Sequence, residues 1–457
     1  MREILIIGAG KSTSVLINHL LEKAESEDLF LRIGDLDLET ARKATQNHQR
    51  CEALALDVFD PASRETAIKR ADIVISMLPA RFHIEVARDC VKFKKNMVTA
   101  SYISKEMKAL DEEVKKNKLV FMNEIGVDPG IDHMSAMQVI DRIRDKGGKM
   151  LMFESFTGGL VAPESDTNLW NYKFTWNPRN VVVAGQGGVA TFIQEGKFKY
   201  IPYHRLFRRT ELLQIDEYGK FEGYANRNSL DYLSIYGLED ILTLYRGTIR
   251  RVGFSRAWNM FVQLGMTDDS FKMSNSENMS YRDFVNSFLP YSPTDSVELK
   301  LRHNLKIDQD DLMWEKLLEL DIFNDEKKIG IKDATPAQAL QKILMDKWSL
   351  APDDKDMIVM YHKFGYELNG EKRQIDSTMV HIGKNQFETA MAKTVGLPLA
   401  IATIKILNKE ILTPGVQLPI KKEVYEPILK ELEKYDIIFK EKESEYLGYN
   451  PFGEVGN

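Results

Sequence analysis

Cysteine is scarce in this sequence. Cys51 and Cys90 are the only two among 457 residues. Two cysteines cannot build a disulfide framework or a cysteine-rich zinc site. The eight histidines show no metal-ligand spacing, and none pairs with a serine or cysteine nucleophile. We therefore expect two reduced thiols in a cytoplasmic protein, and no bound metal ion.

Long apolar runs and an excess of positive charge are also missing. The longest apolar stretch, residues 395–404, contains Gly396 and Pro398 and is about half a membrane span in length. The apolar run at residues 4–7 is too short for the core of a signal peptide. A net charge of −6 argues against nucleic acid or an anionic membrane as the main partner. We expect a small-molecule substrate and no contact with a membrane.

The first 125 residues alternate short apolar runs with amphipathic segments, a pattern typical of parallel βα units. The expected strands are residues 4–7, 30–34, 53–56, 73–77, 97–100 and 119–122. A helix should begin after Asp60, because aspartate caps a helix and Pro61 suits its first position. Six such units predict an α/β fold with a Rossmann-like, doubly wound parallel sheet. A chain of 457 residues is too long for one core, so two or three domains are expected.

The pattern changes from Gly126 onwards. We expect a helix at residues 132–146, a strand at 150–156, and aromatic and glycine-rich segments up to about residue 265. Residues 270–348 are predicted to be mostly helical, with helix starts at Ser280 and Thr335. Residues 357–367 and 373–382 alternate in polarity around Asn369 and Gly370, which indicates a hairpin. Helices at 389–407 and 425–434 close the chain.

A partial dinucleotide-binding motif follows the first expected strand. Gly8, Ala9 and Gly10 would let backbone N–H groups approach a pyrophosphate at a helix N-terminus. The third glycine of the usual fingerprint is replaced by Thr13, so a plain strand–helix turn remains an alternative. Asp35, at the end of the second strand, would accept hydrogen bonds from the ribose hydroxyls and repel a 2′-phosphate. NAD is therefore favoured over NADP, although Asp35 also suits a simple turn.

One competing motif can be excluded. Gly10, Lys11 and Ser12 look like the end of a Walker A loop, which requires a glycine five residues before its Gly-Lys pair. Leu5 stands there, inside the expected strand. We expect Lys11 and Ser12 to contact a dinucleotide instead.

Three long segments give a more specific signal: residues 97–104, 122–133, and 157–164 with Tyr172–Trp176 downstream. Three shorter segments, at residues 224–229, 246–250 and 394–398, belong to the same signal. Together these motifs resemble the glutamate-forming saccharopine dehydrogenases, also called saccharopine reductases. The resemblance spans nearly the whole chain.

The resemblance implies a homodimer and a particular domain order. A Rossmann-like domain would cover residues 1–125, and a substrate-binding and dimerisation α/β domain residues 126–268 and 352–385. A small all-helical insert would cover residues 269–351. The C-terminal segment, 386–457, would return to the first domain.

The reaction implied by the resemblance converts saccharopine, NAD(P)+ and water into glutamate, 2-aminoadipate 6-semialdehyde and reduced cofactor, or runs in reverse in lysine metabolism. Tyr102 and Asp128 follow strands of the expected sheet, at the edge where such folds bind ligands. The resemblance places the family's proposed catalytic tyrosine and aspartate on these two positions. An alternative for Asp128 is an ordinary Asp-Pro-Gly turn.

Saccharopine carries three carboxylates, and arginine binds a carboxylate bidentately. The resemblance assigns substrate contacts to Arg227, Arg250 and Thr248, beside Ser101, Tyr102 and Asp128. The alternative for either arginine is a solvated surface charge. The family often has a cysteine at the position of Thr157, so the role of this hydroxyl stays open.

We expect the cofactor to contact a wider set of residues than the glycine-rich motif and Asp35. This set is Asp57, Val58, Leu78, Ala100, Val127, Asp128, Pro129, Thr175 and Trp176. Two other functions remain open. A non-catalytic NAD(P)-binding sensor would not need the two arginines, and a carboxy-polyamine dehydrogenase would bind a substrate with fewer carboxylates. Residues 123–133 resemble the saccharopine branch better.

Overall fold

The computed structural model describes residues 1–10, 13–446 and 448. The chain forms two compact units. The first comprises Met1–Lys149 and Met379–Lys440, and the second Met150–Thr378 and Glu441–Asn457.

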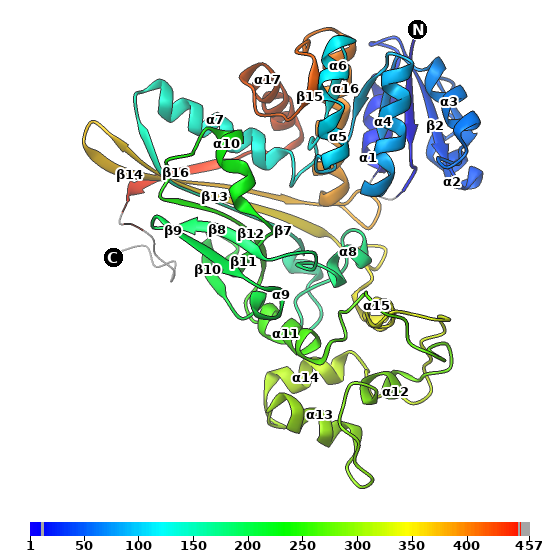
Figure 1. Ribbon diagram of the computed structural model, residues 1–457, viewed down its shortest axis with the longest axis vertical. Helices are drawn as coiled ribbons and strands as arrows, with labels where there is room; N and C mark the ends of the chain where they lie inside the picture. Colours follow the sequence, from blue (N-terminus) through cyan, green and yellow to red (C-terminus); the bar gives the residue numbers. More distant parts are fainter. Residues whose placement is uncertain (11–12, 447, 449–457) are drawn as a thin grey trace. The chain divides into compact units, whose positions relative to one another are not determined.

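The first unit is built on a parallel sheet (Figure 1). In the described residues its strand order is β15-β6-β5-β4-β1-β2-β3. The bounds are β1 Arg2–Ile7, β2 Leu29–Asp35, β3 Cys51–Ala55, β4 Ile73–Ser76, β5 Asn96–Val98, β6 Val120–Met122 and β15 Gly415–Gln417. All six strands expected in the first 125 residues are present, and so is the predicted doubly wound α/β sheet. The chain reverses direction across the sheet between β1 and β4, which is where such folds bind ligands.

Helices cover both faces of this sheet because its strands are apolar on both sides. One face packs against α3 (Pro61–Arg70), α4 (His83–Lys92), α5 (Lys105–Ala109) and α6 (Asp111–Lys116) around Leu5, Ile7 and Val74. Asp60 caps α3 as predicted, since its carboxylate accepts from the N–H groups of Ala62 and Ser63. The remaining early helices are α1 (Ser14–Glu22) and α2 (Leu38–Thr45).

Residues Met379–Lys440 of the C-terminal segment complete the first unit, whereas β16 (Lys440–Glu445) joins the sheet of the second unit and does not return to the first domain as expected. Strand β15 pairs with β6, and helix α16 (Ala390–Leu407) packs against α1. The two helices approach closely at Gly396, where a Cβ atom would lie 2.7 Å from the Leu16 nitrogen. Helix α16 has the length and hydropathy of a membrane span, but 67% of its residues are buried in the protein. A buried core helix passes the same test, so this finding is weak evidence for a membrane.

Helix α7 (Ile131–Asp145) belongs to the first unit. The reason is tertiary packing. Helix α17 (Lys422–Leu432), which comes from the C-terminal segment, lies against α7. Their contact includes a hydrogen bond of 2.9 Å from the Tyr425 hydroxyl to Asp141 Oδ2.

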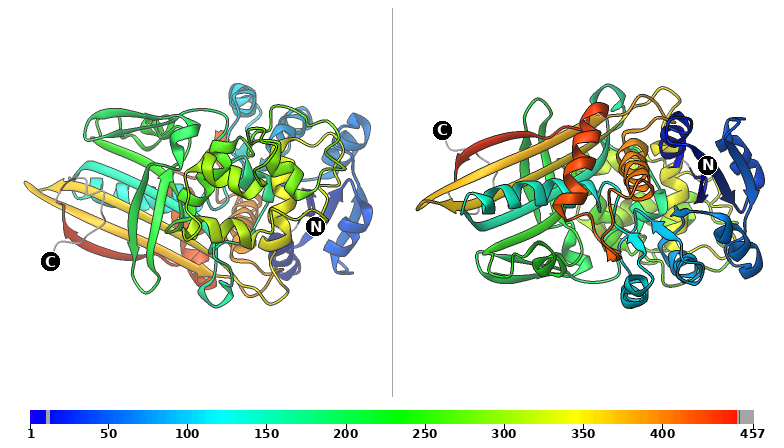
Figure 2. Two further views of the ribbon diagram at one scale, coloured as in Figure 1. Left: turned by 90° about the horizontal axis from the view of Figure 1, so that it is seen from below. Right: turned by 90° about the horizontal axis from the view of Figure 1, so that it is seen from above.

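The second unit is built on a mixed sheet of long strands (Figure 2). In the described residues its order is β10-β11-β12-β7-β13-β14-β16, with β8 pairing both β12 and β9. The bounds are β7 Lys149–Val161, β8 Ala190–Gln194, β9 Lys197–Ile201, β10 Thr210–Ile215, β11 Gly219–Ala225, β12 Thr243–Arg251, β13 Asp356–Leu368, β14 Glu371–Ile382 and β16 Lys440–Glu445. The predicted hairpin is confirmed, because β13 and β14 meet at Asn369 and Gly370, both with positive φ.

Helices fill the segment between β12 and β13. They are α11 (Phe254–Leu264), α12 (Tyr281–Asn286), α13 (Val297–Leu305), α14 (Leu312–Glu319) and α15 (Pro336–Trp348), and α12 to α15 group together in Figure 2. Both predicted helix starts are correct. Ser280 and Thr335 each form a capping box. Three short helices lie between β7 and β12: α8 (Pro178–Val182), α9 (Tyr203–Leu206) and α10 (Leu233–Tyr236).

Candidate functional site

The glycine-rich motif lies at the carboxyl end of β1, next to β4. Gly8 has φ +102°, and a Cβ atom there would lie 2.9 Å from the Met77 carbonyl oxygen. Only glycine fits this position without strain. Around Gly10, by contrast, a Cβ would meet nothing within 4 Å among the described residues, which leave the backbone there open to a ligand. Ala9 lies between them, and Lys11 and Ser12 lie outside the described residues.

Asp35 closes the other side of this loop. Its Oδ2 accepts a hydrogen bond of 2.8 Å from the Ala9 N–H, and its Oδ1 accepts one of 3.0 Å from the Asp37 N–H. A carboxylate oxygen has two acceptor sites, so both oxygens keep capacity for a hydroxyl group. The structure therefore brings together the glycine-rich loop and the acidic residue that the sequence analysis assigned to the ribose.

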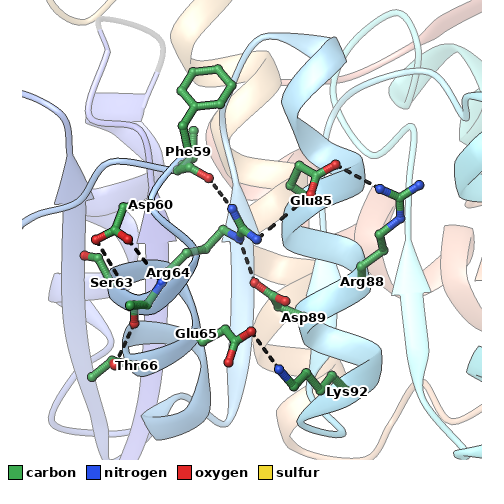
Figure 3. Close-up of polar contacts among 12 residues, drawn as sticks. Phe59, Asp60, Ser63, Arg64, Glu65, Thr66, Glu85, Arg88, Asp89 and Lys92 are labelled. Atoms are coloured by element: carbon green, nitrogen blue, oxygen red, sulfur yellow. Dashed lines mark hydrogen bonds and ion pairs between the residues drawn. The ribbon is translucent and has the colours of Figure 1, made fainter.

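The loop after β3 carries two further expected cofactor contacts, Asp57 and Val58. Arg64, buried on α3, donates from Nη1 to the Val58 carbonyl and from Nε to Asp89 Oδ2 over 2.6 Å. Figure 3 shows this guanidinium reaching from α3 toward Glu85 and Asp89 of α4. Arg64 thus ties the Asp57–Val58 loop to the next helix.

Tyr102 and Asp128 meet at the same edge of the sheet. Tyr102 follows β5 and Asp128 follows β6, and the Tyr102 hydroxyl donates a hydrogen bond of 3.1 Å to Asp128 Oδ1. Both side chains are partly exposed. Because parallel strands end at one edge, two separate loops bring a phenol and a carboxylate into contact here. Ala100 lies in the same loop as Tyr102, and Leu78 lies in the neighbouring loop after β4.

The loop that carries Asp128 is a tight turn. The Gly126 N–H donates to the Pro129 carbonyl over 2.9 Å, and the Ile131 N–H donates to the Gly126 carbonyl over 2.9 Å. Gly130 has φ +147°, and a Cβ there would lie 2.1 Å from the Gly126 oxygen. Val127 and Pro129 are buried on either side of Asp128. Asp128 is therefore a turn residue whose carboxylate also faces Tyr102, so the two interpretations of this residue are compatible.

A buried histidine lies behind Ser101. His83 Nδ1 is 2.8 Å from Ser76 Oγ, and His83 Nε2 is 2.7 Å from Ser101 Oγ. Desolvation lowers the pKa of His83 to about 4. The imidazole is therefore neutral at physiological pH, with one N–H donor and one acceptor nitrogen. Ser101, an expected substrate contact, is held by a fixed partner.

Arg250 of β12 is buried in the second unit. Its Cζ lies 5.1 Å from the centroid of the Tyr172 ring and 5.4 Å from that of Phe254. Its Nη1 donates to the Ile249 carbonyl over 2.8 Å, whereas its Nε is buried without a hydrogen-bond partner among the residues that the structure describes. Within the described ranges no carboxylate lies within ion-pair distance of this guanidinium. A buried cation without a counter-charge is costly, and an anionic ligand would offset that cost.

Thr248 and Thr157 share the face of the sheet that carries Arg250. Thr248 pairs with Thr157 of β7, and Arg250 lies two residues further along β12. The Thr157 and Thr175 hydroxyl oxygens are both buried and lack partners in the described part of the chain. Trp176 is 42% exposed. This face of the second unit therefore holds a cation and, in the described part of the chain, the unsatisfied Thr157 hydroxyl.

Arg227 differs from Arg250. Its side chain is exposed, and its backbone is in the left-handed region, with φ +55°. Its carbonyl accepts a hydrogen bond of 3.0 Å from the Thr191 N–H. Arg227 is therefore exposed, as expected of a charge on the surface, whereas Arg250 is buried.

The geometry of the first unit defines a class of protein. The parallel sheet carries a glycine-rich loop after β1, an acidic residue at the end of β2, and a phenol–carboxylate pair at the same edge. This combination is the architecture of a dinucleotide-dependent oxidoreductase. Among the described residues no group of three or more histidine, cysteine, aspartate or glutamate side chains could hold a metal ion.

Comparisons with known proteins give the family. Residues 4–122 match the saccharopine dehydrogenase NADP binding domain, and residues 126–438 match the saccharopine dehydrogenase C-terminal domain. The chain therefore belongs to the saccharopine dehydrogenase family, which confirms the resemblance found in the motifs.

The relatives are similar over almost the whole chain. The NADP+-dependent, L-glutamate-forming saccharopine dehydrogenase of Saccharomyces cerevisiae is 32% identical over 448 residues, which cover 96% of this chain and 99% of the relative. The mitochondrial alpha-aminoadipic semialdehyde synthase of Rattus norvegicus is 32% identical over 96% of this chain and 47% of its own length. The solved apo structure of the yeast L-Glu-forming enzyme matches with a TM-score of 0.87 at 31% identity, covering 97% of this chain and 100% of the other.

Proposed function

We propose that this protein interconverts saccharopine with L-glutamate and 2-aminoadipate 6-semialdehyde, using a nicotinamide dinucleotide, as a step of lysine metabolism. The observation that carries the proposal is the hydrogen bond between Tyr102 and Asp128 at the ligand-binding edge of the first unit. It supplies a proton-transfer pair in a chain whose relatives are named for this reaction.

The reaction needs several proton movements. A bound nicotinamide would supply the hydride acceptor for the carbon beside the bridging amine. The amine loses a proton as the C=N bond forms, water then adds to that carbon, and the C–N bond breaks to release glutamate. In sum, water is consumed and one proton is released. The Tyr102 hydroxyl can accept a proton from the amine or the water as it passes its own proton to the Asp128 carboxylate, and the reverse transfer returns a proton to the departing amine.

Arg250 is the best candidate for the residue that binds a carboxylate of the substrate. It is a preformed cation whose Nε is unsatisfied, and the aromatic rings of Tyr172 and Phe254 hold it in place. Its planar fork suits a bidentate contact. The Thr157 hydroxyl on the same face, which has no partner within the described ranges, offers a further donor.

Reduction of the dinucleotide, measured by absorbance at 340 nm, tests this proposal. The purified protein should reduce the cofactor with saccharopine and show no reduction with lysine or glutamate alone, since neither contains the bridging secondary amine. A protein that binds the dinucleotide but leaves saccharopine unchanged would be a sensor, and the proposal would be wrong.

We further propose that the enzyme prefers NAD+ to NADP+, although the matching domain is named for NADP. The Asp35 carboxylate lies against the Ala9 N–H, where it would face a 2′-phosphate. Two like charges about 5 Å apart repel by roughly 3 kcal/mol at an effective dielectric constant of about 20, or on the order of 10²-fold. The ratio of kcat/KM for the two cofactors should therefore favour NAD+.

Asp35→Asn isolates this charge, because the amide oxygen still accepts from the Ala9 N–H. This variant should lose most of the discrimination against NADP+, and Asp35→Ser combined with a nearby arginine should invert it. Asp72→Asn is the matched control. Asp72 is an exposed carboxylate that accepts from the Glu3 N–H over 2.7 Å, before β4 and thus at the opposite edge of the sheet. A wild-type preference for NADP+ would show that Asp35 does not set the specificity.

A further inference from the structure

Both sequence neighbours of Tyr102 are held by buried side chains. On one side, Ser101 Oγ lies 2.7 Å from Nε2 of His83, which is 5% exposed. On the other side, the Ile103 N–H donates to Glu124 Oε1 over 2.9 Å, and Glu124 is also 5% exposed. Tyr102, the proposed acid–base residue, thus lies between two residues that are each held by a hydrogen bond to a buried side chain.

The His83 contact is anchored at its far end. Nδ1 of the ring is 2.8 Å from the hydroxyl of Ser76, a fully buried residue at the end of β4. The neutral ring can donate through one nitrogen only and accept through the other. The hydrogen bonds from Ser76 through His83 to Ser101 therefore connect the end of β4 with the loop after β5. In this series the two hydrogen bonds of the ring run in the same direction, one donated and one accepted.

The Glu124 contact joins the two loops that carry Tyr102 and Asp128. While Oε1 of Glu124 accepts from Ile103, Oε2 lies 2.9 Å from His133 Nε2 on the first turn of α7. The Glu124 N–H also donates to the Ser101 carbonyl over 3.2 Å. Glu124 has φ +53°, a strained conformation for a residue with a side chain, and these bonds hold it there.

We infer that His83 and Glu124 are positioning residues that hold Tyr102 within hydrogen-bond distance of Asp128. This inference rests on the proposed function, in which Tyr102 and Asp128 move protons. Neither residue needs to touch the substrate. Each fixes the backbone or the hydroxyl group next to Tyr102, and an error of about 1 Å in the position of a reacting group costs on the order of 10²-fold in rate.

Two substitutions of His83 separate positioning from packing. In His83→Gln the amide reaches the place of Nε2 and can still bond Ser101, whereas in His83→Asn it reaches the place of Nδ1 and can bond only Ser76. We expect His83→Asn to lower kcat by about 10- to 10²-fold and His83→Gln to recover most of the activity. A role in packing alone would give equal losses in kcat, or no loss in either variant, and would overturn the inference.

Glu124 allows a parallel comparison. Glu124→Gln keeps an oxygen that accepts from the Ile103 N–H, whereas Glu124→Met has a similar length and no acceptor. The methionine variant should lose more kcat than the glutamine variant. His381→Asn is the matched control, since this buried histidine of the same unit bonds the Asp436 carbonyl. It should leave kcat unchanged at equal thermal stability.

A readout without saccharopine keeps this inference apart from the proposed function. Fluorotyrosine placed at position 102 gives one ¹⁹F resonance in the full-length protein. We expect this resonance to move in His83→Asn and Glu124→Met, and to keep its wild-type position in His83→Gln and Glu124→Gln. An unmoved resonance in the first two variants would refute the positioning role. A response of this kind in a protein that does not oxidise saccharopine would uphold the positioning role and refute only the proposed reaction.

Discussion

Tyr102→Phe and Asp128→Asn should each lower kcat by on the order of 10²–10⁴-fold, the range expected when a positioned acid or base is lost. Phenylalanine removes the hydroxyl that donates to Asp128 over 3.1 Å. Asparagine keeps an acceptor for that hydroxyl and a side chain that suits the turn, but it cannot take up a proton. Steady-state kinetics with saccharopine give kcat, and a fluorescence titration gives the affinity for the reduced dinucleotide.

The asparagine variant also decides between the two roles of Asp128. The tight turn from Gly126 to Gly130 is closed by backbone hydrogen bonds, so Asp128→Asn should fold and bind the dinucleotide normally. A near-normal kcat in this variant would mean that Asp128 only shapes the turn. The proton transfer would then need another residue.

Arg250→Ala should raise KM for saccharopine about 10- to 150-fold, because a hydrogen bond to a charged group contributes roughly 1.5–3 kcal/mol. Arg250→Lys should also weaken binding, since an ammonium group keeps the charge but loses the planar fork. KM for the dinucleotide should barely change. Arg227→Ala is expected to act in the same direction if this exposed arginine also contacts a carboxylate.

The neighbouring Arg251 is the control for this experiment. It points to the opposite face of the sheet, where its Nη1 donates to the Tyr218 carbonyl over 2.8 Å and its Cζ lies 4.3 Å from the Phe221 centroid. Arg251→Ala should leave KM for saccharopine unchanged. Equal KM values for wild type and Arg250→Ala would show that this buried cation does not bind the substrate.

The fold could be predicted where the sequence pattern is local. The six strands of the first unit are short apolar runs, and the helix starts at Asp60, Ser280 and Thr335 are defined by neighbouring residues. Strand β15 has three residues, and its position depends on pairing with β6, some 295 positions earlier in the chain, and on a hydrogen bond from the Val416 N–H to Asp111 of α6. The strands β8 to β12 were not predicted individually, because this part of the chain was expected only as aromatic and glycine-rich segments, although β9 alternates lysine and aromatic residues over its first four positions.

Part of the site could also be predicted, because some of its residues belong to a local sequence pattern. Tyr102 and Asp128 were found because each follows a strand end, and strand ends share an edge. The sequence analysis missed His83, since a histidine on α4 shows its role only when Ser76 and Ser101 lie on either side of it. Glu124 and His133 stood within a recognised motif, but their bond spans a turn that the sequence does not show. The burial of Arg250 also could not be foreseen, because arginine is usually exposed.

Identification of the products tests the central claim most directly. The wild-type protein, incubated with saccharopine and NAD+ or NADP+, should form one molecule of glutamate for each molecule of dinucleotide reduced, with an aldehyde that can be trapped in equal amount. This result would establish oxidation at the carbon on the aminoadipate side of the bridging amine. Formation of lysine and 2-oxoglutarate, or no turnover with either cofactor, would contradict the account.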